Sequence, residues 1–115
     1  MAGGHANRRR GEVEAVIDGD RRILCLTLGA LAELETAFSV SDLNGLADRF
    51  SSGRLKAADM IRLIGAGLRG GGNLLSDDEV AAMSVEGGVV GYARIVGDLL
   101  AATFVGAEAE PAVNP

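Results

Sequence analysis

The segment Gly65-Ala66-Gly67-Leu68-Arg69-Gly70 matches the G-x-G-x-x-G pattern of dinucleotide-binding sites. In such a site the glycines follow a strand and open a helix, so that main-chain amides face the pyrophosphate. Here they close a predicted helix that begins near Ala57, and no predicted strand precedes them. We therefore interpret Gly65 and Gly67 as positions of close helix packing and Gly70 to Gly72 as a flexible break. No nucleotide cofactor is expected.

Other chemically reactive side chains also lack the partners that catalysis needs. Ser76-Asp77-Asp78-Glu79 has the spacing of a helix capping box, so its carboxylates are interpreted as helix N-terminal groups and not as metal ligands or an acid pair. The single cysteine, Cys25, is interpreted as a small buried hydrophobe, because the single histidine, His5, lies in the predicted leader. The sequence predicts no catalytic residue, no metal site and no cofactor, and the protein is not expected to be an enzyme.

Composition excludes further classes of function. The chain has 115 residues, a formal net charge of -5, a pI near 4.7, 48% hydrophobic residues and 3% aromatic residues. An acidic chain with few aromatic rings is a poor nucleic-acid binder, since phosphate contacts need clustered cations and base stacking needs rings. Arg8-Arg9-Arg10 is interpreted as a solubilising tail. No apolar run is long enough to span a membrane, and no signal peptide is recognised, so a cytoplasmic location is expected.

The length allows one domain. We expect a flexible leader at residues 1–10, a single α+β domain at 11–106 and a flexible tail at 107–115. The domain begins with a β-hairpin around Asp18-Gly19-Asp20, a turn signal in which Gly19 can adopt a positive φ. A two-residue turn would place Val13 and Ala15 on the same face as Leu24 and Leu26, whereas a three-residue loop would place them with Ile23 and Cys25. The sequence leaves this register open.

About five helices follow the hairpin in a compact bundle. Thr27 is the expected N-cap of the first, whose predicted apolar face contains Leu28, Leu31, Leu34 and Phe38. The second is expected from Asp42 to a stop at Gly53. The others are expected at about 57–68, after Ser76 and at about 89–105. The predicted buried stripe of the last helix is Val89, Tyr92, Val96, Leu99, Leu100, Thr103 and Phe104.

Several sequence segments resemble one known family. They are Gly11–Gly19, Leu24–Glu35, Phe50–Leu55 and Gly65–Gly72. The chain is similar to the small proteins encoded in the tail gene cluster of gene transfer agents in alphaproteobacteria and of related long-tailed phages and prophages. Members are grouped with tail assembly chaperones, and some descriptions label them tail tube proteins. The resemblance covers about residues 7–105.

This resemblance implies a non-catalytic tail assembly chaperone. Such a chaperone holds the tape measure protein, whose apolar helical segments would otherwise aggregate before tail tube subunits polymerise around it. The implied partners are therefore the tape measure protein and tail tube subunits. The alternative is a structural tail component, a tube or adaptor subunit retained in the particle. A tube subunit is usually a β-rich fold whose sheets join around a ring, whereas this sequence predicts one hairpin.

Two protein-binding surfaces are predicted. The third helix has more apolar residues than one face needs, so some of them could form an exposed contact site: Met60, Ile61, Leu63, Ile64 and Leu68. A central helix that is buried all round explains the same pattern. The second surface is the hairpin, with Val13 and Ala15, whose strand edges could pair with a partner or with a second copy. Charged side chains that keep such an edge monomeric are the alternative there: Glu12, Glu14, Arg21 and Arg22.

Overall fold

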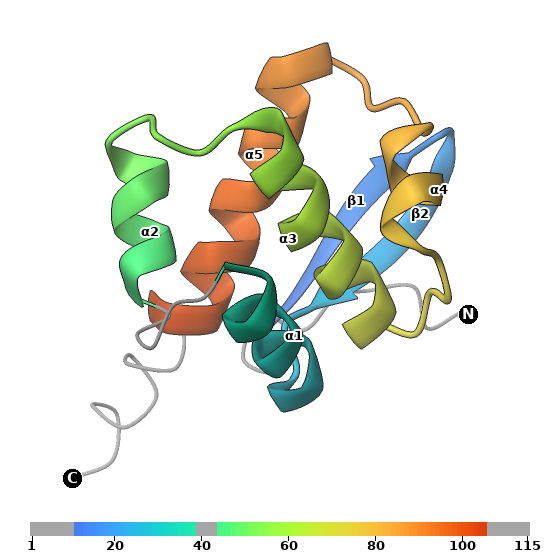
Figure 1. Cartoon of the computed structure of the whole chain (residues 1–115). Coiled ribbons are helices and arrows are strands. Elements are labelled where there is room, and N and C mark those ends of the chain that lie inside the picture. Colours follow the sequence, from blue (N-terminus) through green and yellow to red (C-terminus); the bar gives the residue numbers. More distant parts are fainter. Residues whose placement is uncertain (1–10, 39–43, 106–115) are drawn as a thin grey trace, which may run out of the picture.

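The computed structural model describes residues 11–38 and 44–105. It confirms the α+β prediction, with an N-terminal antiparallel hairpin followed by five helices (Figure 1). The elements are β1 (Glu12–Ile17), β2 (Asp20–Cys25), α1 (Leu28–Phe38), α2 (Asn44–Ser51), α3 (Ala57–Gly70), α4 (Asp77–Ala81) and α5 (Gly88–Leu100), with a π-helical turn, η2 (Ala101–Val105), continuing α5. The predicted leader, the predicted tail and the start of the second helix at Asp42 lie outside the described residues.

The hairpin has the two-residue turn. Asp18 and Gly19 both have positive φ angles, 56° and 86°, and Ile17 pairs with Asp20 to close the turn. This primed turn matches the right-handed twist of the strands that it joins. Val13 pairs with Leu24 and Ala15 pairs with Arg22, so these side chains share the face that also carries Ile17. The arginine beside the apolar face is therefore Arg22.

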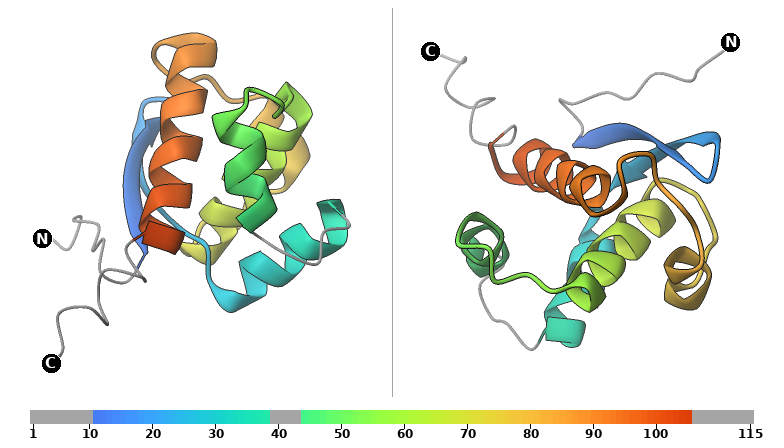
Figure 2. Two further views of the ribbon diagram at one scale, coloured as in Figure 1. Left: turned by 90° about the vertical axis from the view of Figure 1, so that its left-hand side faces the viewer. Right: turned by 90° about the horizontal axis from the view of Figure 1, so that it is seen from above.

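Helices α3 and α5 cover one face of the hairpin, and α1, α2 and α4 surround them (Figures 1 and 2). The hairpin contributes Val13, Ala15, Ile17 and Leu24 to the core. The helices contribute the rest of the fully buried large side chains, namely Leu34, Leu46, Leu63, Ile64, Leu68, Val80, Val96 and Leu99. Burial of these apolar side chains is the main stabilising term for a fold of this size.

Two predicted helix caps are confirmed. The Thr27 hydroxyl accepts a hydrogen bond from the Ala30 N–H at 3.1 Å at the start of α1. At α4, the Ser76 hydroxyl accepts from the Glu79 N–H at 3.1 Å, while the Glu79 carboxylate accepts from the Ser76 N–H at 2.9 Å. These bonds satisfy main-chain donors that a helix leaves unpaired at its start.

Two predicted core positions are wrong, both on the first turn of a helix. Leu28 is 85% exposed, because α1 turns its Ala30 and Leu34 side to the core. Val89 is 72% exposed, because the first turn of α5 projects beyond the neighbouring helices at the top of Figure 1. Periodicity gives the direction of an apolar stripe, but it does not say where along the helix a neighbour stops covering that stripe.

Candidate functional site

The glycine motif lies inside and at the end of α3. At each glycine the missing side chain leaves room for an atom of a neighbouring residue to lie against the helix. A Cβ atom at Gly65 would collide with the Asp77 carboxylate, and one at Gly67 would lie 2.7 Å from a methyl group of Leu99. A Cβ atom at Gly70 would collide with the main-chain carbonyl of Cys25. The motif is thus a packing surface, as predicted for Gly65 and Gly67. The predicted break at Gly70 to Gly72 coincides with the end of α3, where Gly70 and Gly71 are packed against carbonyls of β2; its flexibility stays a prediction.

Arg69 joins three helices through its guanidinium group. Its Nη2 lies 2.7 Å from Oε1 of Glu33 on α1, and its Nη1 lies 3.1 Å from Oδ1 of Asp77 on α4. The same Nη1 donates to the Leu75 carbonyl at 2.8 Å. The hydrogen bond to Glu33 is the largest of the effects that raise the pKa of Arg69; desolvation opposes it, and Asp77 adds to it. We call Arg69, Glu33 and Asp77 the Arg69 cluster.

Two of the three acidic residues in the first turn of α4 have structural partners. Asp77 pairs with Arg69, and Glu79 caps the helix. In the described part of the chain, no group of three His, Cys, Asp or Glu side chains could hold a metal ion. Cys25, which was interpreted as a small buried hydrophobe, is only partly buried.

Most of the residues predicted to bind a partner are core residues. Leu63, Ile64 and Leu68 are at most 1% exposed on α3. Val13 and Ala15 are 2% and 9% exposed on the inner face of the hairpin. The remaining two, Met60 and Ile61, are partly buried at the start of α3 and could contact a partner without unfolding. A binding role for these residues stays a prediction.

The outer edge of β2 is covered by the chain itself. In a two-residue hairpin the outward main-chain groups of this strand belong to alternate residues, including Ile23 and Cys25. The Asn73 side chain donates to the Ile23 carbonyl at 2.9 Å, and Gly70 and Gly71 lie against the carbonyls of Cys25 and Ile23. No further strand pairs with β2 in the described sheet, as predicted, but residues at and after the end of α3 lie against this edge where a partner strand would have to pair.

Among the described residues, main-chain pairing at the outer edge of β1 is seen at its turn end. Ile17 forms an isolated bridge with Val85, and the Asp18 N–H donates to the Ser84 carbonyl at 2.7 Å. The main-chain N–H and C=O groups that point outward from this strand include those of Glu14 and Val16, whereas those of Val13 and Ala15 are directed at β2. A small hollow of about 180 Å³ lies between this edge and α5.

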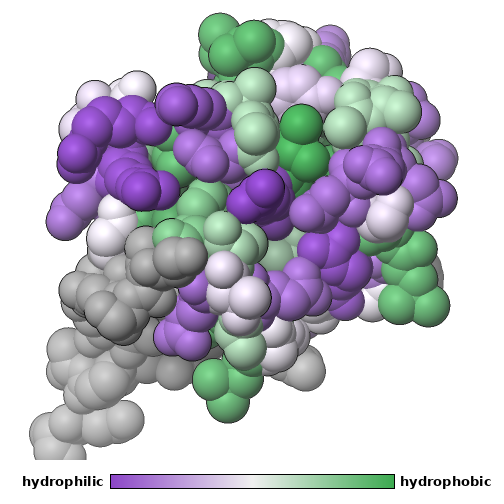
Figure 3. Space-filling model, viewed as in Figure 1, coloured by the Kyte–Doolittle hydropathy of each residue, from purple (hydrophilic) through white to green (hydrophobic). Residues whose placement is uncertain are grey.

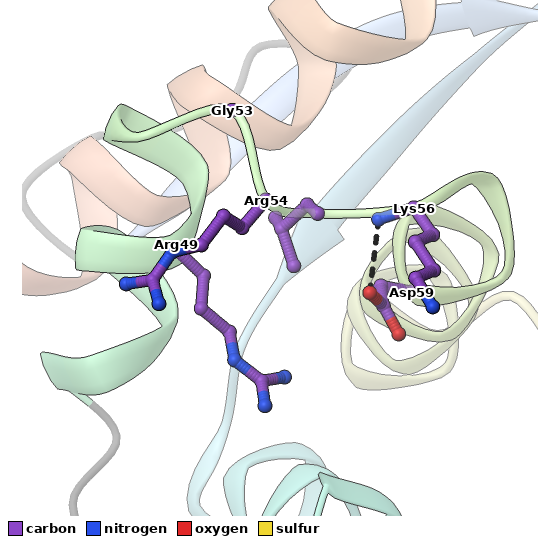
Figure 4. A pocket seen from close by; sticks show the side chains of 6 residues that line it. Arg49, Gly53, Arg54, Lys56 and Asp59 are labelled. Atoms are coloured by element: carbon purple, nitrogen blue, oxygen red, sulfur yellow. Dashed lines mark hydrogen bonds between the residues drawn. The ribbon is translucent and has the colours of Figure 1, made fainter.

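A basic pocket lies between the end of α2 and the start of α3, and sequence reasoning missed it. Arg49, Gly53, Arg54, Leu55, Lys56 and Asp59 line a hollow of about 630 Å³. In Figure 4, Arg49 projects from α2, Arg54 starts in the loop after Gly53 and runs back over α2, and Lys56 and Asp59 stand on the α3 side. Hydrophilic residues cover this end of the molecule in Figure 3.

The local sequence explains why two of these arginines are neighbours. Gly53 has φ +74° and ends α2 in a Schellman motif, with the Gly53 N–H bonded to the Phe50 carbonyl and the Arg54 N–H bonded to the Arg49 carbonyl at 2.8 Å. The sequence signal for this pocket was a cluster of cations around the predicted helix stop at Gly53. Three cations lie within four residues of this glycine, although the chain as a whole is acidic.

Comparison with known proteins gives the family. A family model described as "Phage tail tube protein, GTA-gp10" matches residues 10–106. The chain belongs to this family. It is therefore a phage or gene transfer agent tail protein, and the family is not an enzyme family. No curated protein and no solved structure matches the chain. Among the described residues, none of the helices has the length and apolar character needed to cross a membrane.

Proposed function

We propose that this tail protein is a non-catalytic assembly chaperone that binds the tape measure protein before the tail tube forms around it. One observation carries the proposal, namely the covered edge of β2. A ring built by joining sheets needs two free edges on every subunit, because each contact is head to tail. Here Asn73, Gly70 and Gly71 lie against the outward carbonyls of Ile23 and Cys25 on β2, which leaves β1 as the one edge of the described sheet that a further strand could extend.

The exposed apolar side chains supply contacts of the kind that a chaperone needs. Val89 and Val90 are neighbours on the first turn of α5 and are 72% and 69% exposed. Leu28 and Leu74 are also strongly exposed, at separate places on the surface. Small exposed apolar patches are typical contact sites, and several weak ones suit a client that must later be released.

Co-expression tests the proposal. The tape measure protein should be insoluble when expressed alone and soluble when expressed with this chain. The variant Val89→Ser/Val90→Ser should keep its fold, because both side chains face water, and should recover less soluble tape measure protein. If the solubility of the tape measure protein is the same with and without this chain, the proposal fails.

A structural tail component is the second candidate, because the matching family is described as a tail tube protein. In that case the chain must stay in the finished particle in many copies. An adaptor that needs no continuous ring of sheet would be compatible with the covered β2 edge. The amount of the chain in purified particles separates this candidate from the chaperone.

A further inference from the structure

Among the described residues, the cations of the basic pocket form no ion pair with a carboxylate, as is also true of Arg62 and Arg94, but they differ from these two in lying together around one hollow. Arg21 lies 3.3 Å from Glu14, and Arg69 contacts two carboxylates. By contrast, Arg49, Arg54 and Lys56 form no ion pair with any of the residues that the structure describes. Three positive charges therefore border one hollow of a protein whose net charge is negative.

Local contacts hold these side chains in place without neutralising them. The Arg54 Nε donates to the Ser52 hydroxyl at 2.8 Å, which leaves the two terminal nitrogens of its guanidinium group for a ligand. The Arg49 guanidinium lies 6.0 Å from the centre of the Phe38 ring, at the outer limit of a cation–π contact. The one acid of the pocket, Asp59, accepts a hydrogen bond from the Lys56 N–H at 2.9 Å and so caps α3.

We infer that Arg49, Arg54 and Lys56 form a binding site for a carboxylate-bearing segment of a partner polypeptide. Guanidinium groups bind carboxylates through paired hydrogen bonds, and the hollow is large enough for a few residues of extended chain. The inference does not depend on which tail protein is the partner. A failure of the proposed chaperone activity would not contradict this binding site, and loss of the site would not contradict the chaperone activity.

An acidic peptide fits the site better than a nucleic acid does. A nucleic acid carries a continuous line of charge that would run beyond the pocket over a surface with an excess of acidic residues. A short acidic segment needs only the pocket itself. Leu55, which also lines the hollow, adds an apolar contact for the stem of a glutamate or a neighbouring apolar residue.

The test measures binding of fluorescein-labelled hexaglutamate by anisotropy at an ionic strength of about 0.01 M, where the Debye length is about 30 Å. The variant Arg49→Gln/Arg54→Gln/Lys56→Gln should bind about tenfold more weakly, as expected from the loss of three exposed ion pairs. The matched control is Arg21→Gln/Arg62→Gln/Arg94→Gln, which removes the same charge at exposed positions elsewhere. It should bind no more than about threefold more weakly, and hexaglutamine should bind neither protein.

Circular dichroism checks the fold of each variant. If the triple variant is unfolded, Arg54→Gln/Lys56→Gln replaces it, because that pair leaves α2 and the contact of Arg49 with Phe38 intact. Absence of hexaglutamate binding to the unmodified protein overturns the inference, and so does equal weakening in the variant and the control. Tighter binding of single-stranded oligothymidylate through the same three residues would also overturn it and would assign the pocket to nucleic acid.

Discussion

The two ends of α3 use the same residue type in opposite ways. At the C-terminal end, Arg69 is held between carboxylates of α1 and α4, and glycines let β2 and α5 pack against the helix. At the N-terminal end, Arg49 and Arg54 face a hollow and have no carboxylate partner among the described residues. A charge that is already paired holds elements of the fold together, whereas an unpaired one is available to a ligand.

The first prediction concerns a substitution at the packed C-terminal end of α3, and it has the largest expected effect on stability. Gly71→Ala should destabilise the protein by about 3 kcal/mol or more, because the new methyl group would collide with the Ile23 carbonyl, and main-chain atoms cannot turn aside. Urea denaturation followed by circular dichroism measures the loss. The control is Gly45→Ala on α2, where nothing lies within 4 Å and the change should be neutral or stabilising by up to about 1 kcal/mol. Equal stability of the two variants would show that the C-terminal end of α3 does not require a glycine at position 71.

The second prediction compares one substitution at both ends of α3. Arg69→Gln should cost about 2 kcal/mol, because Glu33, Asp77 and the Leu75 carbonyl lose their shared donor. We expect a value at the lower end of the range for charged hydrogen bonds, since both carboxylates are more than 40% exposed. Arg49→Gln should cost less than about 0.5 kcal/mol. The midpoints of urea unfolding decide, and a larger loss at Arg49 would reverse the comparison.

The third prediction concerns the start of α4, which carries Asp77 to Arg69. Ser76→Ala removes the hydroxyl that accepts from the Glu79 N–H and should cost about 1 kcal/mol. In the Arg69→Gln background the same change should cost less, because α4 no longer has an ion pair to position. A double-mutant cycle measures this coupling. Strict additivity would mean that the cap and the Arg69 cluster stabilise the fold independently.

The fourth prediction has the smallest expected effect on stability. Replacing Arg49, Arg54 and Lys56 together by glutamine should leave the unfolding free energy within about 0.5 kcal/mol of the original, because no ion pair among the described residues is lost. Thermal unfolding at two salt concentrations measures it. A loss as large as that of Arg69→Gln would assign these cations to the fold and not to a ligand.

Local sequence signals predicted much of the fold. The turn at Asp18-Gly19, the caps at Thr27 and Ser76, and the stop at Gly53 each depend on residues within a few positions of one another, and each is confirmed. The hairpin register stayed open, because both alternatives left an arginine beside an apolar face. The residue that accommodates this arginine is distant in sequence. The Asn73 side chain accepts a hydrogen bond from Arg22 at 3.1 Å and donates one to the Ile23 carbonyl on the outer edge of β2.

The candidate site was less predictable. The apolar positions of α3 looked like a surplus, but Leu63, Ile64 and Leu68 are buried because β2, α1, α4 and α5 all pack on that helix. The basic pocket is formed by the end of α2, the connection through Gly53 and the first turn of α3. Only the cluster of cations was visible in the sequence; whether carboxylates neutralise them is a property of the fold.

Quantitative mass spectrometry of purified tail particles tests the proposed chaperone function most directly. The particles are taken from cells in which the chain is abundant in the lysate, and the chain is measured against the tail tube subunit. A chaperone that is released on tube assembly should be absent from the particles or present only in trace amounts. Recovery of the chain in amounts comparable to the tube subunit would contradict the proposal and establish a structural tail component.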